Sequence, residues 1–120
     1  METRVAAASP HQLVALLFEG LSDALARARG AMQAGRIADK GRAIGHAVRI
    51  VEEGLRASLN KRDGGAVAAE LDQLYTYLAL RLTHANLHND AAALQECSDL
   101  IEPVKLAWLA IDPARAPAAR

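Results

Sequence analysis

Aromatic and β-branched residues are scarce in this sequence, which argues against a core built on β-sheet. Phe, Trp and Tyr make up 3% of the chain, whereas apolar residues as a whole make up 52%, with Ala and Leu prominent. Sheets depend on β-branched and aromatic side chains, while Ala and Leu favour helix. The 120 residues suffice for one hydrophobic core but not for two ordinary domains. We therefore expect one all-α domain over 1–120.

An excess of charge of either sign is also missing. Lys and Arg total 14, Asp and Glu total 14, and the formal net charge is 0. Proteins that bind a phosphate backbone need a basic surface, because most of their affinity comes from neutralising phosphates. Nucleic acid is therefore not an expected partner.

Long apolar runs and paired cysteines are absent too. No run approaches the roughly 20 apolar residues that span a bilayer, and the opening METRVAAASP lacks the regions of a secretory signal. We expect no membrane insertion and a cytoplasmic location. The single cysteine, Cys97, cannot form an internal disulfide. We interpret it as a small buried apolar residue rather than a nucleophile.

Four stretches show the apolar period of a helix. Ser9, Pro10 and Gln12 form a helix start with a capping box, and Gly35 provides a left-handed stop for this first helix. Further helices are expected at about 37–59, at about 66–88 after a turn at 60–65, and beyond the N-cap Asp90. Short connections make sequence neighbours antiparallel, which predicts an up-down-up-down four-helix bundle.

Two features depart from this regular pattern. Pro103 lies within the fourth apolar stripe, and since proline cannot donate a backbone hydrogen bond, we expect it to kink or split the last helix near Ile101. The ends carry no sustained apolar period. We expect residues 1–8 to form a flexible arm and residues 112–120 a disordered tail.

Residue patterns for catalysis or cofactor binding are missing. No Glu precedes a His by three positions as in di-iron bundles, and neither a phosphate-binding glycine loop nor a serine elbow occurs. We expect no enzyme activity and no cofactor. His84 and His88 stand one helical turn apart, a spacing that can hold zinc or nickel, but the intervening Glu of the zincins is absent. Two solvated histidines are the simpler interpretation.

Projection of each helix at 100° per residue leaves apolar residues outside the core stripe. Those on the second helix are mostly small and predict a shallow trough, while the third and first helices add larger side chains. The set comprises Ala43, Ala47, Ile50, Gly54, Ala57, Tyr77, Leu80, Leu87 and Leu16. Several such residues on neighbouring helices indicate an exposed patch that binds a partner helix in a groove.

Two alternatives remain open from spacing alone. The wide apolar arcs could serve contacts with two neighbouring helices inside the bundle. The same face could also form a homodimer or an adaptor contact.

Three stretches resemble the flagellin-specific export chaperone family, FliS. RVAAASPHQLVALLFEG resembles the family's small-residue run, Ser-Pro pair and leucine-rich first helix, and GGAVAAELDQLYTYLALRLTHANLHND resembles its third-helix signature. Trp108 stands where the last helix of the family usually carries a tryptophan. The order and spacing of these stretches over about 5–110 make the combined resemblance specific.

The resemblance implies an antiparallel bundle that binds the disordered carboxy-terminal region of flagellin, prevents premature polymerisation and delivers it to the flagellar type III export apparatus. It implies no cofactor. A ligand that folds on binding loses conformational entropy, so it needs a long apolar interface. Together with the surplus apolar surface, the resemblance predicts a flagellin groove on the second and third helices.

Overall fold

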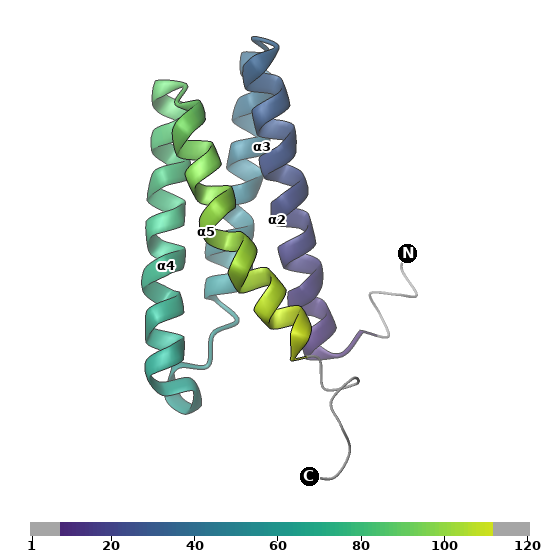
Figure 1. Ribbon diagram of the computed structural model, residues 1–120, viewed down its shortest axis with the longest axis vertical. Coiled ribbons are helices and arrows are strands. Elements are labelled where there is room, and N and C mark those ends of the chain that lie inside the picture. Colours follow the sequence, from purple (N-terminus) through teal and green to yellow (C-terminus); the bar gives the residue numbers. More distant parts are fainter. Residues whose placement is uncertain (1–7, 112–120) are drawn as a thin grey trace.

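A computed structural model describes residues 8–111, and these residues form a bundle of helices (Figure 1). The elements are α2 (Pro10–Gln33), α3 (Ile37–Arg49), the π-helical segment η1 (Ile50–Arg56), α4 (Lys61–His88) and α5 (Ala91–Ala110). η1 follows α3 without a gap, so the two elements form one rod. The predicted all-α four-helix bundle is confirmed. The predicted arm and tail fall, apart from Ala8, outside the described residues.

Helix starts agree with the capping signals in the sequence. The Gln12 amide donates to Ser9 Oγ over 3.1 Å, and the Ser9 amide donates to Gln12 Oε1 over 2.8 Å, which completes the capping box. The Ala93 amide donates to Asp90 Oδ1 over 3.1 Å at the start of α5. A cap of this kind stabilises a helix by about 1 kcal/mol. Both predicted N-caps are confirmed.

The second rod changes its helical period midway. The expected uninterrupted α-helix at 37–59 is α-helical only to Arg49 and then becomes the π-helix η1. A π-helix pairs residues five apart and turns less per residue than an α-helix. A projection at 100° per residue therefore loses its phase after Ile50.

The connection into α4 depends on a side-chain cap and on a glycine with a non-helical backbone. Asn60 accepts a hydrogen bond from the Asp63 amide over 3.1 Å and caps a short helical turn. Gly65 then breaks the helix with φ 56° and ψ −131°, a conformation that disfavours any residue with a Cβ. The main body of α4 follows this break, close to the predicted start at 66.

A buried lysine joins the far end of α4 to the start of α3. Lys40 Nζ donates to the Asn86 carbonyl over 3.0 Å and to Asn89 Oδ1 over 3.1 Å. Asn89 adopts the left-handed conformation that ends α4, with φ 51°. The ammonium thus lies at the carbonyl end of a helix, where the helix dipole favours positive charge.

Pro103 does not split the last helix. α5 is helical from Ala91 to Ala110 with Pro103 inside it. Both Pro103 and Asp99, the residue whose carbonyl loses its helical donor, are exposed, so water can satisfy that carbonyl. The predicted split near Ile101 is therefore wrong.

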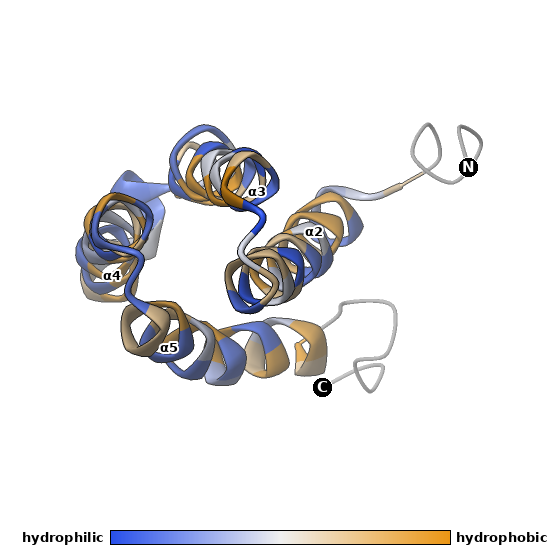
Figure 2. Ribbon diagram, turned by 90° about the horizontal axis from the view of Figure 1, so that it is seen from above, coloured by the Kyte–Doolittle hydropathy of each residue, from blue (hydrophilic) through white to orange (hydrophobic). Residues whose placement is uncertain are grey.

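The core fills the space that the four rods enclose, which Figure 2 shows from above. Its largest sealed side chains are Phe18, Leu21, Ile44, Leu55, Leu78, Leu82, Leu94, Val51 and Cys97. Cys97 is 1% exposed, which confirms it as a buried residue, and burial raises the pKa of its thiol to about 11. Leu13, Ile37 and Val67 lie on the apolar stripes of their helices, where the helical period predicts burial, but they are exposed. All three lie near the starts of helices, where no neighbouring rod covers them.

Candidate partner-binding surface

The predicted trough on the second rod is filled by α2. Ala47 is 0% exposed and Ile50 is 8% exposed. A Cβ added at Gly54 would lie 2.9 Å from Leu17 Cδ2, and one added at Gly20 would lie 3.4 Å from Ile50 Cδ1. The small residues thus allow α2 to approach closely. The expectation that Ala47 and Ile50 are exposed to a partner helix is wrong, and Gly54 is half-buried against Leu17.

The other members of the predicted patch are dispersed over the surface. Ala43 is half-buried and lines a polar hollow of about 590 Å³ with Arg27, Arg36 and Arg42, between α2 and α3. Leu16 is half-buried on α2, and Ala57 is exposed just after η1. These three residues therefore do not form one groove.

The predicted residues on α4 are exposed as expected, but they do not adjoin the trough. Leu80 is 66% and Leu87 is 77% exposed, whereas Leu78 and Leu82 of the same helix are sealed in the core. At 100° per residue, Leu80 and Leu87 therefore point away from the bundle. The Tyr77 hydroxyl donates to the Glu96 carboxylate of α5. The patch on α4 thus lies apart from the second rod's small residues.

A different apolar surface opens at the end of the bundle where α2 begins and α5 ends. α5 starts beside α4 and crosses obliquely toward the start of α2 (Figure 1). A pocket of about 460 Å³ lies between these elements, and we call it the end pocket. Its lining comes from all four rods and is mainly apolar, with polar side-chain groups only on Ser58, Tyr75 and Trp108: Val14, Phe18, Leu55, Ser58, Leu59, Val67, Leu71, Tyr75, Pro103, Val104, Ala107, Trp108 and Ile111.

The end pocket has a sealed floor and an exposed rim. Phe18, Leu55 and Tyr75 are each buried, whereas Val67 is 65% exposed and Ile111 is also exposed. The last turns of α5 are largely coloured as hydrophobic in Figure 2. Apolar side chains that stay in contact with water at a concave site are a favourable surface for an apolar ligand.

A contact between His11 and Trp108 fixes the α5 wall of the end pocket. The two rings stack with centroids 4.7 Å apart and an interplanar angle of 9°. Trp108 Nε1 donates to the His11 carbonyl over 3.1 Å, and His11 Nε2 lies 2.7 Å from the Trp108 carbonyl oxygen. Trp108 also borders a second apolar hollow that includes Leu13 and Leu17. The apolar surface therefore continues past Trp108 onto α2.

Sequence reasoning missed the end pocket because its lining has the same period as the core. Val14 and Phe18 flank the apolar stripe of the first helix, and Leu71, Val104 and Trp108 lie on the stripes of the third and fourth. The only local signal is that these stripes continue into the terminal turns of helices. Whether another rod covers those turns cannot be read from one helix at a time.

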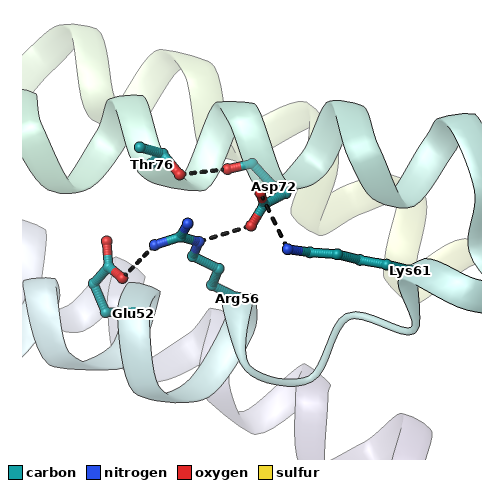
Figure 3. A network of polar contacts seen from close by, with 5 residues as sticks. All are labelled: Glu52, Arg56, Lys61, Asp72 and Thr76. Atoms are coloured by element: carbon teal, nitrogen blue, oxygen red, sulfur yellow. Dashed lines mark hydrogen bonds and ion pairs between the residues drawn. The ribbon is translucent and has the colours of Figure 1, made fainter.

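An ion-pair network joins η1 to α4 (Figure 3). Arg56 Nε lies 2.7 Å from Asp72 Oδ1, Arg56 Nη1 lies 2.9 Å from Glu52 Oε1, and Lys61 Nζ lies 3.4 Å from Asp72 Oδ2. Thr76 Oγ1 donates to the Asp72 carbonyl. Exposed ion pairs contribute little individually. This network nevertheless links η1 to α4, the two elements that contribute Leu55 and Tyr75 to the end pocket.

Acid should destabilise the bundle through its paired carboxylates. Hydrogen bonding, chiefly from Arg56, holds the pKa of Asp72 below 3.8, and the hydrogen bond from Tyr77 is the main reason why the pKa of Glu96 lies below 4.5. The unfolded chain therefore binds more protons in acid. We expect a constant melting temperature above about pH 5 and a fall below about pH 4.5, with a shallower fall for Asp72→Asn, both measured by circular dichroism. If the melting temperature of Asp72→Asn fell with pH just as that of the unchanged protein does, this role of Asp72 would be contradicted.

Within residues 8–111, the histidine pair is not part of a larger group of metal-binding side chains. His84 and His88 have ring centroids 4.5 Å apart, and His84 Nε2 lies 3.2 Å from Asp90 Oδ2. Among residues 8–111, no three or more His, Cys, Asp or Glu side chains are grouped so that they could hold a metal ion. Over the same residues, no helix has the length and apolar character needed to cross a bilayer.

A four-helix bundle with an apolar pocket at one end is the class of protein that this structure defines. The model of the family described as flagellar protein FliS matches residues 1–115, and the chain belongs to that family. It is 42% identical over 113 residues to the flagellar secretion chaperone FliS of Salmonella typhimurium, covering 94% of this chain and 84% of that protein. It is 44% identical over 108 residues to the flagellar secretion chaperone FliSB of Pseudomonas aeruginosa, covering 90% and 85%. The corresponding Vibrio cholerae protein is 38% identical over 113 residues, covering 94% and 82%.

Proposed function

We propose that this protein is an export chaperone that binds the disordered carboxy-terminal region of flagellin in the cytoplasm and delivers it to the flagellar export apparatus. The observation that carries the proposal is the end pocket, a concave apolar surface that the bundle's own rods leave uncovered. Membership of a family whose relatives are flagellar secretion chaperones supports the role. Occupation of the segment by the chaperone would keep flagellin from polymerising before export.

The end pocket suits an amphipathic segment that becomes helical when it binds. Such a segment presents apolar side chains at i, i+3, i+4 and i+7, and the pocket offers apolar walls from α2, η1, α4 and α5. Ordering a disordered segment costs conformational entropy, so a single pocket is too small to hold it alone. We therefore assign the end pocket as the anchor and the adjoining hollow beside Leu13 and Leu17 as its continuation.

Calorimetry with a synthetic peptide of the flagellin carboxy terminus tests the proposal. We expect binding at micromolar concentration with a negative heat-capacity change, because apolar surface is removed from water. Trp108 is the only tryptophan and lines the end pocket, so its fluorescence should change on binding. A peptide with its apolar residues replaced by Ser is the control.

Absence of binding at micromolar concentration would refute the chaperone assignment. A sedimentation series without peptide tests the other use of an apolar face, a homodimer. Self-association that disappears when peptide is added would place both contacts on one surface.

A further inference from the structure

Tyr75 carries a polar group on the floor of the end pocket that the bundle leaves without a partner. The residue is 3% exposed and lines the end pocket. Its hydroxyl makes no hydrogen bond within residues 8–111, yet it is not among the buried polar atoms that are closed off from solvent. The hydroxyl therefore keeps some contact with solvent, on a residue that lines the end pocket. Burial raises the pKa of Tyr75 to about 12, so the phenol is protonated and can donate a hydrogen bond.

The other polar groups along this wall are already used inside the bundle. Ser58 Oγ donates to the Gly54 carbonyl over 2.6 Å. Trp108 Nε1 donates to the His11 carbonyl over 3.1 Å. Among the side-chain donors that line the end pocket, the Tyr75 hydroxyl is thus the one that makes no hydrogen bond with residues 8–111. Buried tyrosines normally place their hydroxyl against a partner.

We propose that the Tyr75 hydroxyl donates a hydrogen bond to an uncharged side-chain oxygen of the segment bound in the end pocket. The inference rests on the proposed function and specifies the chemistry of its ligand. A carboxylate would lose its hydration against apolar walls, which disfavours Asp and Glu at this place. Backbone carbonyls within a bound helix are already paired. The acceptor is therefore a Ser, Thr, Asn or Gln side chain within an otherwise apolar face.

This contact would select among apolar segments. An apolar pocket alone discriminates poorly between similar apolar side chains, whereas a buried hydrogen-bonding group penalises a ligand that leaves it unpaired. The end pocket would thus favour a helix with one polar position facing its floor. Register along the segment would be fixed by the same contact.

The first test compares Tyr75→Phe with Tyr77→Phe, using the flagellin carboxy-terminal peptide in calorimetry. Tyr75→Phe should weaken binding about threefold to tenfold, because one buried hydrogen bond is lost. Tyr77→Phe should bind as the unchanged protein does, since its hydroxyl contacts Glu96 outside the pocket. The melting temperature of Tyr75→Phe should be unchanged or higher. Unchanged affinity would overturn the inference, and a lower melting temperature would show that the hydroxyl has a partner inside the bundle.

The second test identifies the acceptor with a double-mutant cycle. Each Ser, Thr, Asn and Gln of the peptide is replaced by Ala and measured against both the unchanged protein and Tyr75→Phe. One replacement should weaken binding to the unchanged protein and have no further effect on Tyr75→Phe. If no replacement behaves in this way, the side-chain acceptor is refuted. If the unchanged protein does not bind the peptide at all, the proposed function itself fails.

Discussion

A negative charge on the rim of the end pocket should weaken flagellin-peptide binding about tenfold to 100-fold, because Val67→Asp places an unpaired carboxylate against apolar ligand surface. Val67 lies early in α4, where a negative charge is favourable for the helix dipole, so the fold should tolerate the change. Calorimetry with the carboxy-terminal peptide measures the effect.

Leu80→Asp is a closely matched control for this experiment. Leu80 lies on the same helix and is 66% exposed, against 65% for Val67, but it lies outside the end pocket. Its affinity for the peptide should stay within about twofold of the unchanged protein. If Leu80→Asp weakened peptide binding and Val67→Asp did not, the binding surface would instead lie on the outer face of α4.

Ile50→Asp should unfold the bundle rather than affect binding alone. The side chain is 8% exposed and packs at the contact between η1 and α2, where a carboxylate would be largely removed from water. A destabilisation of about 3–5 kcal/mol is expected, a large part of the about 5–15 kcal/mol of an ordinary domain. Urea unfolding followed by circular dichroism measures the free energy of unfolding.

Leu87→Asp provides the comparison, since Leu87 is 77% exposed and should change stability by less than about 0.5 kcal/mol. If Ile50→Asp stayed folded but no longer bound the peptide, the result would support the predicted trough on the second rod as the binding surface. That outcome would also require α2 to move away from η1 when the ligand arrives.

The contact between α2 and the second rod explains why small residues do not mark a ligand site here. Gly54 lies against Leu17, and Gly20 lies against Ile50. Small side chains at such positions let two rods of one bundle approach closely, as they would let a foreign helix approach. Of the interpretations left open by the sequence, wide apolar arcs within the bundle account for Ala47, Ile50 and Gly54. The end pocket is instead lined mainly by large apolar residues.

Sequence alone determined the features that arise from interactions between near neighbours in the chain. Ser9 and Asp90 cap helices because their side chains reach amides three residues away, and Gly65 and Gly35 adopt positive φ because they lack a Cβ. The apolar periods and short connections were enough for the four-helix bundle. The family resemblance, which covers almost the whole chain, came from the same printed residues.

Only the tertiary structure decided which apolar residues are covered. Val67 and Leu71 share a stripe on α4, yet the oblique path of α5 leaves Val67 exposed while Leu71 is half-buried. The π-helical turn at Ile50 shifts the face of the second rod in a way that a regular wheel does not represent. A side chain's exposure depends on the position and angle of a neighbouring rod. Residues that make contact across two rods are far apart in the sequence, so the apolar period of one helix cannot predict these contacts.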